Sequence, residues 1–438
     1  MMILILPWQK FYLGTVKLKF VKSIGVYTIV NILDKTVPFL MLPILTRYLS
    51  PEEFGIIAMF LVFISFIFPF VGLNIHGAVT RQYIDKEKID IASYVTNALY
   101  ILVVTSFILY LLLYMFDTLI LTYFHINSQW FLVIILITIS MVISEIILNI
   151  YNISHRPIHY GIFRILRTLT SYAFIFTFVI LLSKGWKGRV QGQFYGEIIF
   201  AIIGLIILSH SKLIRFGINI DHIKSTLKFG VPLIPHAFGA VIISMSDRLL
   251  ITNMVGIDAT GIYVVAVQIS VIISVVIGSI KQAWAPHFFD KIKINTNESK
   301  RELVKFTYII FIFIFLITLI FSFIIQPLIP YIVDERFHES KNYINWLIYG
   351  ITFQGVYHLF TNYIFYARKT YILMLLTFFV SALNIVISYY LIKLNGPLGA
   401  AQGTFIAYSI TAIIVLYISN KILPMPWNVF KWKNYYNA

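Results

Sequence analysis

Residues 24–57 read IGVYTIVNILDKTVPFLMLPILTRYLSPEEFGII and hold one apolar span together with the start of the next. Three polar residues, Asn31, Asp34 and Lys35, lie inside the first span. A charged side chain near the centre of a bilayer is disfavoured by roughly 2.5 to 3.5 kcal/mol on insertion scales, so such residues normally face protein or water. We therefore expect Lys35 to line an interior path instead of facing lipid.

A helix start follows this first span. Ser50 can cap the new helix, Pro51 suits its first position, and Glu53 can complete a capping box with Ser50. The pattern therefore predicts that a second span begins at this turn.

The composition is that of a membrane protein. The chain has 438 residues, of which 59% are hydrophobic and 12% charged, whereas a soluble domain carries about 25% charged residues. The net charge of +16 then reflects membrane topology and an anionic cargo, and we expect no nucleic acid partner. The sequence has no cysteine, which excludes disulfides, thiol nucleophiles and cysteine metal sites.

Stretches of about 20 apolar residues predict an all-α membrane protein with twelve transmembrane helices. The predicted spans are 23–45, 54–76, 93–116, 130–151, 163–182, 190–210, 227–250, 261–281, 306–329, 343–366, 371–392 and 397–419. An even number of spans places both termini on one side of the membrane.

A pattern from the N-terminus recurs after a basic loop near residue 227. Residues 228–232 parallel residues 23–26, and residues 252–262 parallel residues 46–56 at an offset of about 206. Six spans per half make the repeat parallel. We therefore predict two six-helix lobes with a cleft between them: an N-terminal lobe, residues 1–215, and a C-terminal lobe, residues 216–438.

Lysine and arginine in the connections set the predicted orientation. With a cytoplasmic N-terminus, cytoplasmic residues outnumber those on the opposite face by about three to one, which satisfies the positive-inside rule. The cytoplasmic set includes Arg164, Arg167, Lys431 and Lys433. The exception is the turn at residues 184–189, which is either a solvated hairpin or a periplasmic contact for an acidic group.

Two runs of this sequence resemble a known family. The first comprises Tyr27, Asn31, Pro38, Pro43 and residues 46–55; the second comprises Pro232, Pro235, Asp247, Arg248 and residues 256–263. They resemble Wzx-type polysaccharide flippases, in the polysaccharide-transport branch of the multidrug/oligosaccharidyl-lipid/polysaccharide exporter (MOP) superfamily.

The resemblance implies a function in O-antigen, lipopolysaccharide or capsule synthesis at the bacterial inner membrane. The expected activity is transfer of an undecaprenyl-pyrophosphate-linked oligosaccharide from the cytoplasmic to the periplasmic leaflet. Alternating access would expose the cargo site to each side in turn, driven by an ion gradient, with both termini cytoplasmic. The resemblance also implies a glycan polymerase and a chain-length regulator as partners.

Cations in or near the spans are the candidates to bind a pyrophosphate. Lys35 lies within a span, Arg47 and Arg248 lie at the outer ends of the first and seventh spans, and Arg81 and Lys281 lie at inner ends. Each also has a simpler interpretation: pairing between helices for Lys35, snorkelling to the interface or inner-face topology for the others. With two asparagines suited to a hydrated sugar path, the predicted substrate-binding residues are Lys35, Arg47, Arg81, Arg248, Lys281, Asn31 and Asn74.

Four other ionisable residues are candidates for ion coupling. Glu145 and Glu197 stand as isolated carboxylates in apolar helices, where burial would favour the neutral form. His76 titrates near neutral pH if it is accessible, and Asp34 neighbours Lys35. The alternative for each is a structural hydrogen bond to a neighbouring helix.

No catalytic pattern is present, so we predict that the protein is not an enzyme and binds no cofactor or metal. His155 and His159 flank Pro157 in a turn, a poor metal site. Three other functions remain open: a cation-coupled multidrug exporter of the same superfamily, which needs an acidic cavity, a membrane glycan polymerase, which needs larger loops, and a passive scaffold.

Overall fold

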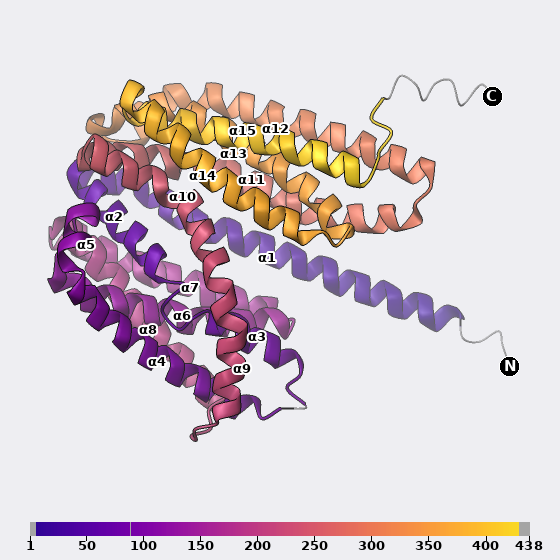
Figure 1. The fold of residues 1–438 in the computed structure, drawn as a ribbon, viewed down its shortest axis with the longest axis horizontal. Helices are drawn as coiled ribbons and strands as arrows, with labels where there is room; N and C mark the ends of the chain where they lie inside the picture. The colour runs from indigo at the N-terminus through magenta and orange to yellow at the C-terminus, as the bar shows by residue number, and fades with distance from the viewer. Residues whose placement is uncertain (1–5, 88, 429–438) are drawn as a thin grey trace. The chain divides into compact units, whose positions relative to one another are not determined.

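The computed structural model describes residues 6–87 and 89–428, and within these residues it contains helices and turns but no strand (Figure 1). Lys431 and Lys433 lie outside the described residues. The first eight α-helices are α1 (Leu6–Tyr48), α2 (Pro51–Ile67), α3 (Ile75–Ile84), α4 (Ile91–Met115), α5 (Asp117–Phe124), α6 (Phe131–Ile153), α7 (Pro157–Phe176) and α8 (Gly185–His210). The next are α9 (Ile220–Gly230), α10 (Ile234–Met254), α11 (Ile257–Ile294), α12 (Asn297–Ile332), α13 (Lys341–Tyr366), α14 (Thr370–Asn395) and α15 (Pro397–Ile422).

Ten helical segments within the described residues are long and apolar enough to cross a membrane. The predicted all-helical, multi-pass membrane protein is therefore confirmed. The two predicted spans without such a segment, 54–76 and 343–366, fall on α2 with α3 and on α13. The number twelve stays a prediction.

The second predicted span is not one continuous helix. Helix α2 ends at Ile67 and α3 begins at Ile75, with positive φ angles at Gly72, Leu73 and Asn74 in the turn between them. Pro69 explains the break, because it has no backbone N–H and disfavours helical geometry at the residue before it. The N–H of Gly72 is satisfied by the Thr105 hydroxyl at 3.0 Å. The apolar run at residues 54–76 therefore predicted one continuous helix, but the backbone turns between residues 67 and 75.

The predicted helix start at Ser50 is confirmed. The Ser50 N–H donates to the Glu53 carboxylate at 3.0 Å, and the Glu53 N–H donates to the Ser50 hydroxyl at 3.1 Å. These are the two reciprocal bonds of a capping box.

The chain divides into two compact units that differ from the predicted halves. Unit 1 comprises Met1–Met41 and Phe63–Ala237, and unit 2 comprises Leu42–Val62 and Phe238–Ala438. The chain passes between the units inside α1, α2 and α10. The lobe boundary at residues 215 and 216 stays a prediction.

In unit 1, glycines bring α8 close to α7. Gly188, Gly192 and Gly196 recur every four residues on α8, and a Cβ at Gly192 would lie 2.6 Å from the backbone nitrogen of Ile175. A Cβ at Gly196 would overlap Ser171. Small residues at this spacing let membrane helices approach closely.

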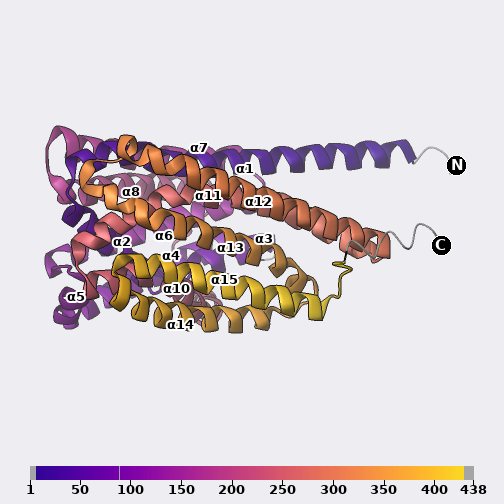
Figure 2. The same ribbon diagram turned by 90° about the horizontal axis from the view of Figure 1, so that it is seen from above.

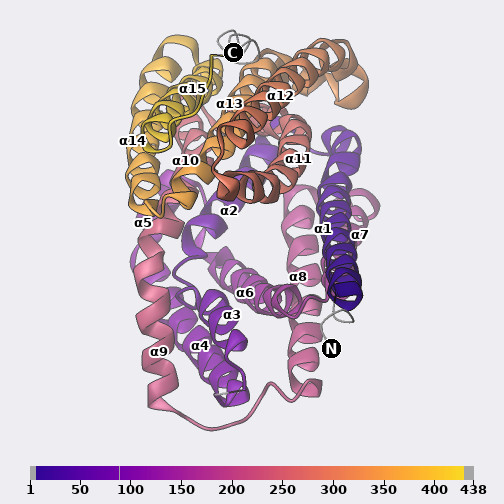
Figure 3. The same ribbon diagram turned by 90° about the vertical axis from the view of Figure 1, so that its right-hand side faces the viewer.

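Helices α3, α4, α6 and α9 also belong to unit 1 and are labelled in Figure 3.

In unit 2, α13 packs on α11 and α15, and α15 packs on α14 (Figure 2). The first turns of α2 and α11 also touch one another. A Cβ at Gly55 would overlap the carbonyl oxygen of Ile257, and a Cβ at Gly261 would overlap that of Pro51. The two glycines therefore make reciprocal contacts.

Candidate functional site

Asp34 is held by α7 along a seam between α1 and α7 in unit 1. The rings of Tyr27 and Tyr160 meet edge to face at 5.1 Å, and Gly161 leaves room for Val30. One turn further along α1, Asp34 accepts a hydrogen bond from Arg164 at 3.0 Å. Thr168 also donates to Asp34, at 2.5 Å. Both oxygens of this carboxylate are thus occupied by groups on α7.

Lys35 is placed differently from its neighbour Asp34. Successive residues on a helix point about 100° apart, and Lys35 is exposed, with no ion pair or hydrogen bond to the described part of the chain. Asn31 lies one turn before Lys35, so the two share a face of α1. This face therefore carries an amide and an uncompensated cation inside the candidate span Gly25–Tyr48.

Arg167 joins Glu145 and Glu197. Its guanidinium donates two hydrogen bonds to Glu197 on α8, at 2.8 and 3.0 Å, and lies 3.9 Å from Glu145 on α6. The side chains of Arg167 and Glu197 are 13% and 10% exposed, and that of Glu145 is 39% exposed. The prediction that these carboxylates are isolated is wrong, because α7 supplies the counter-charge.

Arg164 and Arg167 are functional candidates that the sequence analysis missed. It placed both at the cytoplasmic face, but they lie within the candidate span Pro157–Leu181, about 10 and 15 Å along the helix from its first residue at 1.5 Å per residue. The sequence contained a signal for them. Three carboxylates in apolar helices, Asp34, Glu145 and Glu197, required counter-charges, and two arginines three residues apart share one face of a helix. The glycine repeat on α8 was a second signal, since it brings Glu197 within reach of α7.

Asn74 and His76 lie at the break between α2 and α3. The Asn74 side chain donates to the carbonyl of Gly230 at 3.4 Å, and a Cβ at Gly230 would overlap the carbonyl of Leu73. The Nδ1 atom of His76 is buried, with no hydrogen-bond partner in the described part of the chain. The break thus places an unpaired imidazole nitrogen beside a non-helical backbone.

Arg248 lies in a half-buried cluster of unit 2. Its guanidinium pairs with Asp247 at 2.9 Å and donates to the backbone carbonyl of Ser244. The other oxygen of Asp247 accepts a hydrogen bond from Tyr263 at 2.7 Å. The Arg248 side chain is 13% exposed, so the snorkelling interpretation does not describe it. The adjacent carboxylate compensates its charge.

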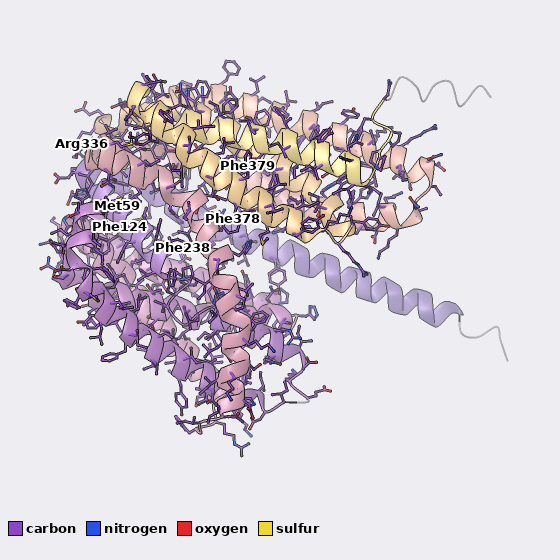
Figure 4. All side chains as sticks on the ribbon, in the orientation of Figure 1. Met59, Phe124, Phe238, Arg336, Phe378 and Phe379 are labelled. Carbon is purple, nitrogen blue, oxygen red and sulfur yellow. The ribbon has the colours of Figure 1, made fainter. Side chains whose placement is uncertain are left out.

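The remaining predicted cations, Arg47, Arg81 and Lys281, are exposed. In unit 2, Arg336 (Figure 4) donates to the backbone carbonyls of Thr46 and Arg47 at 3.0 and 3.2 Å. The same Arg336 donates to Asp334 and thereby lowers the pKa of that carboxyl. These contacts fix the end of α1 without using the Arg47 side chain.

Among the predicted residues, the structure brings together Glu145 and Glu197 through Arg167. No contact among the described residues of unit 2 joins Arg47, Arg248 and Lys281 to one another.

Comparison with known proteins identifies the family. A family model described as "Polysaccharide biosynthesis protein" matches residues 20–291, which is more than half of the chain. The chain belongs to this polysaccharide biosynthesis protein family. The resemblance found in the sequence is thereby confirmed at the level of a polysaccharide biosynthesis family.

Individual relatives support the same family. The capsular polysaccharide biosynthesis protein CapF of Staphylococcus aureus is 25% identical, over 76% of this chain and 82% of its own. The lipid II flippase MurJ, in an inward closed conformation, superposes with a TM-score of 0.70 at 16% identity, covering 91% of this chain and 87% of its own. An inward-facing multidrug resistance MATE transporter superposes with a TM-score of 0.69 at 13% identity, covering 90% and 94%. The two solved structures define the fold.

Proposed function

We propose that this family member is a flippase for undecaprenyl-pyrophosphate-linked oligosaccharide, an O-antigen or capsular repeat unit. It moves the cargo from the cytoplasmic to the periplasmic leaflet of the bacterial inner membrane by alternating access. Both termini are cytoplasmic, the protein catalyses no reaction, and a glycan polymerase and a chain-length regulator act with it. The family description and the similarity to CapF support a polysaccharide precursor as the cargo.

The observation that carries this proposal is the division of charge between Asp34 and Lys35. Asp34 is occupied by Arg164 and Thr168, so it does not neutralise its neighbour. Lys35 therefore keeps a positive charge within a candidate span, where such a charge is costly unless it meets water or an anion. A pyrophosphate head group is an anion of the required kind, and Asn31 on the same face can bind a sugar hydroxyl.

The other predicted binding residues fit this function unequally. Arg47, Arg81 and Lys281 are exposed and remain proposed contacts for the head group. Arg248 is paired with Asp247, so it can bind cargo only after that pair opens. Asn74 lies at the break between α2 and α3, and interrupted helices form substrate sites in many transporters.

The reciprocal glycine contact supports two related lobes, residues 1–215 and 216–438, with six spans each. Gly55 meets residue 257 and Gly261 meets residue 51, and both pairs are related by the offset of about 206 found in the sequence. A contact that exchanges its two members in this way is expected at a two-fold axis between repeats.

Ion coupling is assigned to the cluster of Arg167, Glu145 and Glu197. One guanidinium faces two carboxylates, which leaves one negative charge uncompensated within the cluster. Glu197 makes both short bonds, whereas Glu145 is more distant and more exposed. Glu145 is therefore the carboxylate that exchanges a proton or cation with water.

Replacement of Lys35 by alanine tests this function in cells. We expect lipid-linked glycan to accumulate on the inner leaflet and surface glycan to fall at least tenfold, while Lys35→Arg retains export. Lys293→Ala, which removes an exposed cation of α11 outside the α1 span, is the matched control. Normal surface glycan in the Lys35→Ala cells, at equal protein level, would remove Lys35 from the mechanism.

The second candidate function is cation-coupled multidrug export, which the likeness to the MATE fold favours. An exporter of cationic drugs needs unpaired carboxylates, and in unit 1 Asp34 and Glu197 are both engaged by arginines. Efflux of ethidium that depends on Glu145 and does not depend on Lys35 would favour this alternative.

A further inference from the structure

A cavity of about 220 Å³ opens in unit 1, lined by residues of α3, α4 and α9. These three helices are labelled in Figure 3. Helix α3 lines it with residues 78, 81 and 82, and α9 lines it with residues 225, 228 and 229. Both sets have the spacing i, i+3, i+4, which places each set on one helix face. Each face contributes one cation, Arg81 from α3 and Lys228 from α9.

The charge in this cavity is uncompensated. Arg81 and Lys228 are exposed, and neither has an ion pair with the described part of the chain. None of the described residues that line the cavity is acidic. Two like charges repel when they converge on one space, and an anion between them reverses the sign of that interaction.

The rest of the lining suits a head group. Gln82 donates to the Ser225 hydroxyl at 3.4 Å across the cavity, and Tyr94 and Phe229 supply an apolar wall. The volume is below the roughly 300 to 1,000 Å³ of sites that enclose a drug-sized ligand. Lys228 lies near the beginning of the candidate span Ile220–Met254. The space therefore fits a small anionic group at a membrane surface.

The loop that leads into α9 is tied to α4 by hydrogen bonds. Buried Asn97 donates to the carbonyl of Gly217 at 3.1 Å and accepts from the N–H of Asn219 at 2.9 Å. The Asp90 carboxylate caps α4 by accepting a hydrogen bond from the N–H of Ser93, and it lies 2.8 Å from the Arg215 guanidinium. Both contacts lower the pKa of the Asp90 carboxyl. The loop before α9 is thus fixed by hydrogen bonds at the α4 end, so little order is lost on binding.

We propose that Arg81, which is also a proposed contact for the cargo head group, forms with Lys228 a binding site for a phosphate group, and that this site shares no residue with the Lys35 face of α1. The phosphate belongs to a membrane lipid head group or to a soluble phosphate. Basic pockets between membrane helices bind lipid phosphates in this way. The site rests on the proposed function only for the identity of its natural lipid, since lipid-linked pyrophosphate carries the same chemistry.

Native mass spectrometry of the purified full chain in detergent tests this site. The protein is titrated with phosphatidylglycerol and, separately, with inorganic pyrophosphate. We expect one saturable site for at least one probe, weakened about thirtyfold in the double variant R81Q/K228Q, because each cation near a membrane surface contributes a factor of about five. Saturable binding of phosphatidylglycerol identifies a lipid source, and binding of pyrophosphate alone identifies a soluble one.

Two further variants keep the test decisive. K212Q removes an exposed cation of unit 1 that does not line the cavity, and its binding should match that of the wild type. S225D keeps both cations but adds a carboxylate to the cavity, so it should weaken binding even if R81Q/K228Q misfolds. Absence of a saturable site, or wild-type affinity in both R81Q/K228Q and S225D, overturns the proposal. Loss of transport in Lys35→Ala, with phosphate binding at Arg81 and Lys228 unchanged, would support two distinct sites.

Discussion

The guanidinium of Arg167 holds carboxylates from two other helices of unit 1. It makes two hydrogen bonds to Glu197, which is largely buried, and a longer contact to Glu145. Removing one partner of a buried pair leaves the other charge uncompensated, which costs about 3 to 5 kcal/mol. The net attraction between Arg167 and Glu197 is therefore small, but removing only one of the two side chains strongly destabilises unit 1.

Arg167→Gln should lower the apparent melting temperature of the purified protein by several degrees. The double variant R167Q/E197Q should recover most of this loss, because neither side chain then carries an uncompensated charge. Thermal unfolding in detergent measures both variants.

Glu145→Gln is the comparison within the same cluster. Because Glu145 lies 3.9 Å from the guanidinium and is more exposed, its neutralisation should barely change the melting temperature. A loss in E145Q equal to that in R167Q, or no recovery in the double variant, would contradict the assignment of Glu197 as the main partner.

Among the helices, α8 positions this cluster through its glycines. Gly192 and Gly196 allow α8 to approach α7 so closely that a Cβ would meet backbone atoms of the neighbouring helix. Glu197 follows Gly196 directly, so the close approach also delivers its carboxylate to Arg167. The spacing of the glycines and the ion pair are parts of one arrangement.

Gly196→Ala should therefore destabilise the protein and weaken the ion pair. The added methyl group overlaps Ser171, so α7 and α8 must separate. The matched control is Gly278→Ala in α11, where nothing lies within 4 Å of the added Cβ and alanine gains about 1 kcal/mol in helix propensity. Melting temperatures of the two variants measure the difference; a loss in G278A as large as that in G196A would remove the packing explanation.

The break between α2 and α3 shows where element prediction fails. Hydropathy counts apolar residues and is insensitive to backbone direction, so it joined residues 54–76 into one span. Pro69 and Gly72 were visible in the sequence, but their effect depends on Thr105 accepting the freed N–H of Gly72. That tertiary contact is not readable from a single apolar run.

At the scale of the whole molecule, the reciprocal contact of Gly55 and Gly261 gives a test of the repeat. If the two positions are equivalent, Gly55→Ala and Gly261→Ala should lower the melting temperature by similar amounts. The double variant should lose less than the sum, since both changes open the same contact. Gly239→Ala, where the added Cβ meets nothing within 4 Å, is the control. Unequal and fully additive losses would argue against a two-fold contact.

The sequence predicted the large-scale features better than the pairing of charges. Apolar length gave the helical membrane fold, and the Ser50 to Glu53 pattern gave a helix start that the structure confirms. The pairing of Arg164 and Arg167 was missed because the positive-inside rule assigns a face to a cation without asking which carboxylate it meets. The partner of Asp34 lies 130 positions away in the sequence, and the partner of Glu197 lies 30 positions away. Contacts between residues so far apart in the sequence are seen only in the folded structure.

The most direct test of the central claim is transfer of fluorescent undecaprenyl-pyrophosphate-linked oligosaccharide across proteoliposomes that contain the purified protein. With Asp34 held by Arg164, the charge of Lys35 is the one that the pyrophosphate must meet. We predict transfer by the wild type and by Lys35→Arg, and at least a tenfold slower rate for Lys35→Gln. A Lys35→Gln protein that transfers the lipid as fast as the wild type would contradict the account.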